Sequence, residues 1–202
     1  RRGIAINPLA FIRGIAQAAI SNGAFIFEHT KVDTFSRDNN KWQIKAAAHT
    51  ITADQILLCT NAYTDDIWPR LKRTIIPVRG YQIWTKPLRG NDRGKILKGI
   101  SCALETRRMP TGMRLHHDGR LQFSGGAGLG RERIPNINER LTAIRRIFPN
   151  ISELEVEGWW SGWVTRGIAD GWRLHRLAPG LLTAIGCNGR GVAMGPIMGR
   201  EL

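Results

Sequence analysis

The chain has 202 residues, of which 42% are hydrophobic and 23% are charged, a balance typical of a globular protein with a substantial core. No apolar run approaches the roughly 20 residues of a transmembrane helix, and the first residues lack the apolar segment of a signal peptide. We therefore expect a cytoplasmic protein. Cys59, Cys102 and Cys187 lie far apart and form no CxxC pair, which argues against a disulfide framework and against a zinc site.

The formal net charge of +14 at pH 7 raises the question of a nucleic-acid partner or an acidic membrane surface. The basic residues, however, form only short and separated clusters, at 70–73, 106–108 and 144–147. No helix-turn-helix, zinc-finger or ribonucleoprotein motif accompanies them. This pattern favours a solvated basic surface over nucleic-acid binding.

The first third of the chain predicts a helix followed by short strands. The helix begins at Pro8 with Asn7 as its N-cap and ends at Asn22 and Gly23. A strand is expected at 24–28, and another at 41–46, where apolar and polar residues alternate. The apolar run 54–63 ends in small polar residues, which is typical of a buried strand whose C-terminal end lies at a site.

The rest of the chain predicts longer strands and then a return to α/β structure. Asp118 and Gly119 indicate a hairpin turn, and Pro149 closes a helix. The expected elements are strands at 75–88, 113–126 and 153–163, a helix at 137–148, a strand at 181–185, and a helix from about Val192. An antiparallel insert between α/β ends implies two domains, one of them discontinuous, with boundaries near 70 and 160.

General catalytic motifs are absent from the sequence. There is no GxGxxG, GxxxxGK[ST], GxSxG or HExxH. The segment "GGAGLG" (125–130) comes nearest, but it follows a hairpin strand and predicts a turn. His116 and His117 are adjacent, so a strand directs them to opposite faces and we predict no metal site.

The glycine turn "GCNGRG" (186–191) lies between the last predicted strand and the last helix. Backbone N–H groups at such a helix start are free to face an anion or a carbonyl oxygen. Glycines serve close packing equally well. The residues alone leave a ligand site and a plain tight turn equally open.

The order of several segments resembles the D-amino-acid oxidase-like family of FAD-dependent oxidoreductases. The segments are "NPLAFIRGIAQAAISNGAFIFEHTKV", "ILLCTNAYTDDIWP", "PVRGYQIWT", "DGRLQFSGG", "IFPNISELEVEGWWSGWV" and "LAPGLLTAIGCNGRGVAMGPIMGREL". By "TNAYT..WP" and "WSG", the chain is most similar to γ-glutamylputrescine oxidoreductases within this family. The match covers nearly the whole chain, in order.

The resemblance implies an α/β fold in which an FAD-binding domain of the glutathione-reductase-like type carries an inserted antiparallel-sheet substrate domain. The FAD-binding domain would comprise residues 1–70 and 161–202, and the substrate domain residues 71–160. The family's GxGxxG would then lie upstream. We therefore expect the chain to be the later part of a longer protein.

The resemblance also implies FAD-binding residues. The backbone of Val32 would meet the adenine, a strand end would lie beside the cofactor, and the glycine turn would face the pyrimidine edge of the flavin. The matching positions are Val32, Thr60, Asn61, Ala62, Gly186, Asn188, Gly189, Arg190, Gly191 and Val192. From the residues alone, Val32 is better explained as a core valine, and Asn61 is equally well explained as a strand-ending cap. Arg190 stands where family members often have histidine.

The implied activity is FAD-dependent oxidation of a small-molecule amine or amino acid. Hydride passes from the α-carbon to flavin N5, the imine hydrolyses, and oxygen or another acceptor takes the electrons. Arg107 or Arg114 is the candidate for clamping a substrate carboxylate, although strand arginines commonly face water. No catalytic base is identifiable. Two alternatives stay open: a non-catalytic remnant, and a tRNA-modifying flavoenzyme of the same superfamily, which would need a focused basic patch.

Overall fold

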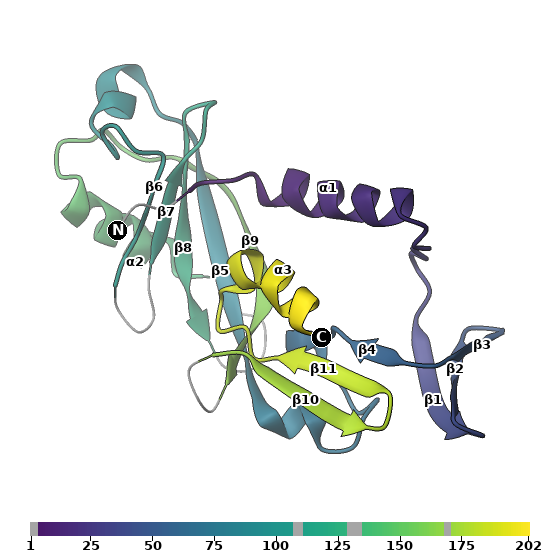
Figure 1. Ribbon diagram of the computed structural model, residues 1–202. Coiled ribbons are helices and arrows are strands. Elements are labelled where there is room, and N and C mark those ends of the chain that lie inside the picture. The colour runs from purple at the N-terminus through teal and green to yellow at the C-terminus, as the bar shows by residue number, and fades with distance from the viewer. Residues whose placement is uncertain (1–3, 107–110, 129–134, 168–170) are drawn as a thin grey trace. The chain divides into compact units, whose positions relative to one another are not determined.

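The computed structural model describes residues 4–106, 111–128, 135–167 and 171–202 (Figure 1). In chain order its helices and strands are α1 (Pro8–Ser21), β1 (Val32–Asp38), β2 (Lys41–Ala46), β3 (His49–Ala53), β4 (Ile56–Leu58), β5 (Ile75–Pro87), β6 (Cys102–Leu104), β7 (Gly112–Leu115), β8 (Arg120–Gly128), α2 (Ile137–Ile147), β9 (Val156–Gly167), β10 (Arg173–Ala178), β11 (Leu181–Ile185) and α3 (Gly191–Glu201). None of the helices in these ranges has the length and apolar character needed to span a membrane.

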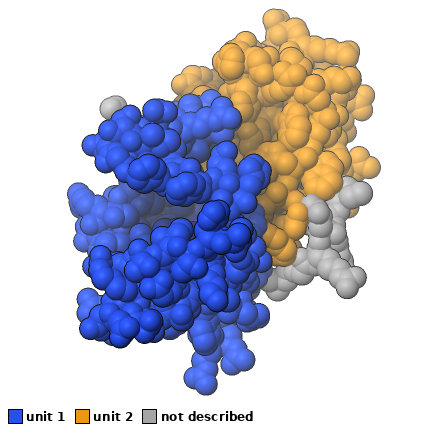
Figure 2. Space-filling model, turned by 90° about the vertical axis from the view of Figure 1, so that its right-hand side faces the viewer, with its two compact units in different colours: residues 1–77, 165–202 blue, residues 78–164 orange. Residues whose placement is uncertain are grey.

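The chain forms two compact units, coloured separately in Figure 2. Unit 1 comprises residues 1–77 and 165–202, and unit 2 comprises residues 78–164. These divisions fall a few residues from the boundaries expected near 70 and 160, and the assignment of an FAD-binding and a substrate domain to them stays a prediction.

Helix α1 begins and ends where the sequence predicts. The side-chain oxygen of Asn7 accepts hydrogen bonds of 3.1 Å from the backbone N–H groups of Leu9 and Ala10, which satisfies donors that the helix itself leaves unpaired. The strand predicted at 24–28 is wrong, because no strand pairs with this segment among the described residues. Phe25 and Phe27 are 85% and 71% exposed, so the apolar run that suggested a strand has no sheet to pack against.

Strands β1, β2 and β3 of unit 1 form an antiparallel meander in that order. The strand predicted at 41–46 is confirmed as β2, and Trp42 and Ala46 are buried on one face of it. Strands β1 and β3 escape sequence prediction because most of their residues are exposed and polar. Strand β1 lies at an edge of this sheet.

A second sheet of unit 1 has the order β10-β11-β4, with β10 antiparallel and β4 parallel to the central strand β11. The strand predicted at 181–185 is confirmed as β11. The strand predicted over 54–63 is too long: β4 ends at Leu58, and a 3-10 turn (Asn61–Tyr63) follows. The reason is the left-handed backbone of Asn61, with φ of 43°, which no regular strand accommodates.

The core of unit 1 lies between these two sheets. Trp42 of β2 packs edge-on against Phe35 and Trp68, and the apolar side chains of β4 and β11 complete the cluster. Gly180, in the turn before β11, has φ of 73°, and a Cβ there would lie 2.8 Å from the carbonyl oxygen of Asp54. The turn thus requires glycine both for its conformation and for its close packing.

Unit 2 is built on a five-stranded sheet with the order β6-β7-β8-β5-β9. The strand predicted at 75–88, the hairpin at Asp118–Gly119 and the helix at 137–148 are confirmed as β5, β7–β8 and α2. The strand predicted at 153–163 is shifted and forms β9 over Val156–Gly167. The turn predicted at "GGAGLG" is wrong over residues 125–128, which continue β8, and residues 126–128 pair with β5. Residues 129–130 lie outside the described ranges.

One face of the five-stranded sheet carries the core of unit 2. Met113, Phe123 and Ile83 stand directly opposite one another on β7, β8 and β5, so their side chains share a face. Ile144 of α2 packs into the same buried cluster, together with further apolar residues of that helix. Helix α2 therefore covers this face of the sheet.

Candidate functional site

Three segments of unit 1 that are far apart in the sequence meet at Asn61. The side-chain oxygen of Asn61 accepts hydrogen bonds from the hydroxyl of Thr165 at 2.9 Å and from the backbone N–H of Gly186 at 3.2 Å. Its side-chain nitrogen donates to the sulfur of Cys187 at 3.2 Å. The end of β4, the end of β9 and the turn after β11 are thereby joined.

A second asparagine fastens the turn to β9. The side-chain oxygen of Asn188, which is 9% exposed, accepts a hydrogen bond of 2.8 Å from the backbone N–H of Gly167. The turn itself is left-handed at three positions, with φ of 85° at Gly186, 49° at Asn188 and 78° at Gly189. Glycine and asparagine are the residues that adopt this conformation at least cost, which explains the composition of the turn.

Cys187 is buried at the centre of this arrangement, with 6% of its surface exposed. Burial by itself raises the pKa of the Cys187 thiol, but hydrogen bonds from Thr165, from Asn61 and from backbone N–H groups outweigh it, and the net pKa lies below its ordinary value. The site thus presents donors to a sulfur atom.

The turn leads directly into the N-terminus of α3. Arg190 occupies the N-cap position and makes no side-chain capping hydrogen bond, so the N-cap side chain leaves the first N–H groups of the helix uncapped. A Cβ built on Gly189 would meet nothing within 4 Å, which leaves open space beside the backbone. An uncapped helix start next to open space fits a carbonyl or anionic oxygen.

The structure brings together most of the residues predicted to bind FAD. Thr60, Asn61 and Ala62 lie at the end of β4, and the 3-10 turn there contacts β11, which leads into the turn 186–191. The predicted residues Gly186, Asn188, Gly189, Arg190, Gly191 and Val192 follow along that turn and the helix start. Val32 is not part of this group: it begins the edge strand β1 in the other sheet of unit 1.

Cys187 and Thr165 both belong to this site and were not predicted from the sequence, and Thr165 is the more distant of the two from the predicted turn. It is completely buried, and its only local context is the tryptophan-rich strand β9, which carries no signal for a site. Its partner Asn61 lies 104 residues away. Only the three-dimensional fold connects the two.

Of the two arginines predicted to clamp a substrate, Arg114 lies on β7 and Arg107 lies outside the described residues. Arg114 stands opposite Gln122 of β8, which stands opposite Trp84 of β5. This row alternates with the buried row of Met113, so its side chains emerge on the opposite side of the sheet.

That opposite side is polar, and we call Arg114, Gln122, Gln82, Ser124 and His116 the polar face of the sheet. The Gln122 amide donates to Gln82 at 3.2 Å, and Gln82 in turn donates to the Ser124 hydroxyl at 3.3 Å. His116 and Gln122 share a hydrogen bond of 2.8 Å. The amides are therefore held in fixed orientations around the row that contains Arg114.

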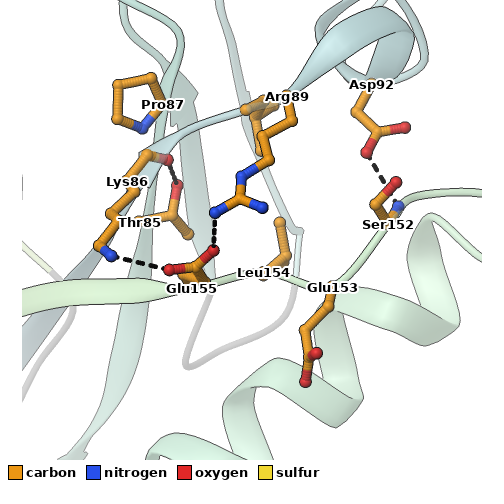
Figure 3. A pocket seen from close by; sticks show the side chains of 10 residues that line it. Thr85, Lys86, Pro87, Arg89, Asp92, Ser152, Glu153, Leu154 and Glu155 are labelled. Carbon is orange, nitrogen blue, oxygen red and sulfur yellow. Dashed lines mark hydrogen bonds and ion pairs between the residues drawn. The ribbon is translucent and has the colours of Figure 1, made fainter.

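A cavity of about 20 Å³ lies elsewhere in unit 2, between the end of β5 and the segment before β9 (Figure 3). Lys86 and Arg89 both form ion pairs with Glu155 at its edge. The carboxylate of Asp92 accepts hydrogen bonds from Lys95 at 2.7 Å and from the Ser152 backbone at 2.9 Å. The cavity has room for about one water molecule, and the polar groups around it are paired with one another. We therefore interpret it as a packing feature that connects β5 to the segment before β9, and not as a ligand site.

Replacing Asp92 by asparagine should make the stability of the protein less sensitive to acid. Hydrogen bonds from Lys95 and Ser152 lower the pKa of Asp92 from 3.8 to about 2, so the folded state binds fewer protons than the unfolded state between these values. The stabilisation is complete above about pH 4 and is lost as the pH falls through about 2. Urea unfolding at several pH values should show a shallower loss for Asp92→Asn than for wild type, whereas Asp38→Asn, on the exposed end of β1, should behave as wild type.

Comparison with known proteins identifies the class to which this fold and site belong. The sequence pattern of the DAO family, described as FAD dependent oxidoreductase, matches residues 1–202. The chain belongs to this family of flavoenzymes, whose cofactor is FAD, as the sequence analysis predicted.

The individual relatives are distant and longer. The probable oxidoreductase OrdL of Haemophilus influenzae is 24% identical over 199 residues, which cover 96% of this chain and 46% of that protein. Glycine oxidase from Bacillus cereus is 21% identical with a TM-score of 0.73, covering 94% of this chain and 52% of the other. Iminodiacetate oxidase from Chelativorans sp. BNC1 is 20% identical with a TM-score of 0.69 and the same two coverages. The predicted α/β fold is thus confirmed, and the chain spans about half the length of these proteins.

Proposed function

We propose that the protein to which this chain belongs oxidises a small-molecule amine or amino acid with FAD as its cofactor. The observation that carries the proposal is the uncapped start of α3, joined through Asn61 to the end of β4, in a chain whose whole length matches the DAO family. The oxidases named above act on amino-acid-like molecules, which supports the same substrate class here.

The turn 186–191 and the first residues of α3 would hold the flavin. Their backbone N–H groups are directed by the left-handed residues of the turn, and the open space at Gly189 admits a flat ring edge. Val32, on the edge strand β1, would serve the adenine end. The donor-rich, uncapped helix start is the feature of this chain that fits the flavin.

When bound, FAD supplies the capacity to accept a hydride from the carbon that bears the substrate amine. The N–H groups at the start of α3 would favour negative charge on the facing ring edge, because the helix dipole is positive there. Arg190 is exposed at the N-cap and would add a full positive charge close to the same edge. These groups stabilise charge without taking part in proton transfer.

The polar face of the sheet in unit 2 would recognise the substrate. A guanidinium binds a carboxylate through two parallel hydrogen bonds, and Arg114 is the arginine of this face beside the ordered amides of Gln82 and Gln122. A substrate that carries both a carboxylate and an amine suits these donors and acceptors. γ-Glutamylputrescine is such a molecule, and its oxidation stays a prediction that rests on the segments around Thr60 and Trp160.

Flavin absorbance of the purified protein tests the proposal, with the full-length protein and the 202-residue chain compared side by side. We expect the full-length protein to retain FAD. Gly189→Ala should raise the Kd for FAD about tenfold, because alanine is strained at φ of 78° by roughly 1–2 kcal/mol.

Gly94→Ala is the matched control. Gly94 has no positive φ, and an added Cβ there meets nothing within 4 Å, so the same substitution should leave FAD affinity unchanged. If neither the full-length protein nor the 202-residue chain bound FAD, the proposal would be contradicted and the protein would be a non-catalytic remnant.

A further inference from the structure

We propose that Asn61 and Thr165 are positioning residues that hold the turn 186–191 in its flavin-binding conformation without contacting the flavin through their own side chains. The inference rests on the flavin site proposed above. It assigns these two side chains a task different from the direct cofactor contact that the family resemblance implies for Asn61.

The side chain of Asn61 is occupied by the protein. Its oxygen accepts two hydrogen bonds, from Thr165 and from Gly186, and an amide oxygen has two lone pairs. Its nitrogen is directed at the sulfur of Cys187. The amide therefore faces the junction of the three segments, and its acceptor capacity is filled there.

Thr165 connects strand β9 to the junction formed by the end of β4 and the turn after β11. Its side chain is completely buried, and its hydroxyl lies 2.9 Å from the Asn61 oxygen and 3.5 Å from the Cys187 sulfur. The single hydroxyl proton is best used in the shorter contact. Gly167, two residues further along the same strand, donates its N–H to Asn188 in the turn. The last three residues of β9 thus fasten the turn at two points.

The turn needs such fastening because its backbone is costly to form. Gly186, Asn188 and Gly189 are all left-handed within four residues, and backbone in sparsely populated regions persists only where its surroundings hold it. The direction of the N–H groups that follow, at the start of α3, depends on these three residues. Loss of the Thr165 hydroxyl should therefore change the flavin environment at a distance.

Two threonine-to-valine variants of the full-length protein separate positioning from general stability. Thr165 and Thr183 are both completely buried, and each hydroxyl donates one hydrogen bond, from Thr183 to the Leu58 carbonyl at 2.7 Å. Valine preserves the shape of either side chain. Thr165→Val should raise the Kd for FAD about tenfold and shift the flavin absorption band, whereas Thr183→Val, with a comparable loss of thermal stability, should do neither.

The thiol of Cys187 supplies a readout that does not require flavin. In a background where Cys59 and Cys102 are serine, the pH profile of Cys187 alkylation reports the donors around its sulfur. Its midpoint should move upward in Asn61→Gly, which removes the nitrogen that donates to the sulfur and keeps the left-handed backbone. It should also move upward in Thr165→Val, because the Asn61 amide that donates to the sulfur then loses the hydrogen bond that orients it, and it should stay in place in Thr183→Val.

The outcomes separate a failure of the proposed function from a failure of the positioning role alone. A wild-type protein that binds no FAD would overturn the proposed function and this inference with it. FAD bound by wild type, with Thr165→Val and Thr183→Val indistinguishable in affinity and spectrum, would overturn the positioning role alone. An alkylation midpoint that moves while FAD affinity stays the same would overturn it as well, because the contacts would then exist without directing the turn.

Discussion

Arg114→Met should lower kcat/KM for an amino-acid substrate by about 30-fold or more, because removal of one partner from a hydrogen-bonded charge pair costs about 2–5 kcal/mol. Methionine approximates the length of the arginine stem, so the packing of the polar face is largely kept. The same variant should oxidise the matching amine without a carboxylate about as well as wild type does. Steady-state kinetics with the paired substrates measures both effects.

Arg120 provides the matched control on the same sheet. Its guanidinium is held by Glu157 at 2.6 Å and Asp118 at 2.8 Å, and these two carboxylates raise its pKa further. It is therefore engaged within the protein, and Arg120→Met should change stability more than kcat/KM. Equal losses for the substrate and its decarboxylated analogue in Arg114→Met would show that Arg114 does not bind the carboxylate.

Short sequence patterns predict those helices, turns and strands that are determined by interactions between residues close in the sequence. Asn7 and Pro8 fix the start of α1 through hydrogen bonds within three residues, and Asp118–Gly119 fixes a hairpin in the same way. The apolar run of β11 predicts its strand because both of its neighbours in the sheet bury it. In each case the stabilising contact is close in sequence, or the apolar composition of the segment indicates that it is buried.

Elements that depend on distant partners are harder to predict. The run 24–28 is as apolar as a strand, but no partner strand meets it among the described residues, whereas the mostly polar β1 becomes a strand because β2 pairs with it. The same holds for the site. The segments around Asn61 and Gly186 are recognisable by family resemblance, but the hydrogen bonds that Thr165 and Gly186 donate to Asn61 span more than 100 residues and follow only from the fold.

Phe123→Ala should destabilise unit 2 by about 3–5 kcal/mol, the usual cost of removing a buried phenylalanine side chain. Phe123 is 1% exposed and stands between Met113 and Ile83 in the central row of the core face, so the cavity left behind has packed neighbours on both sides. Urea unfolding should show a lower midpoint with an unchanged slope, since the surface exposed on unfolding stays nearly the same.

Leu104→Ala tests whether burial is the cause. Leu104 lies on β6 of the same sheet but is 71% exposed, so its truncation should change stability by less than about 0.5 kcal/mol.

Because Phe123 alternates along β8 with Gln122 and Ser124 of the polar face, its loss should also loosen the amides that surround Arg114. Substrate KM should therefore rise in Phe123→Ala even under conditions where the protein stays folded, and not in Leu104→Ala. A loss of less than about 1 kcal/mol in Phe123→Ala would contradict its place at the centre of the core.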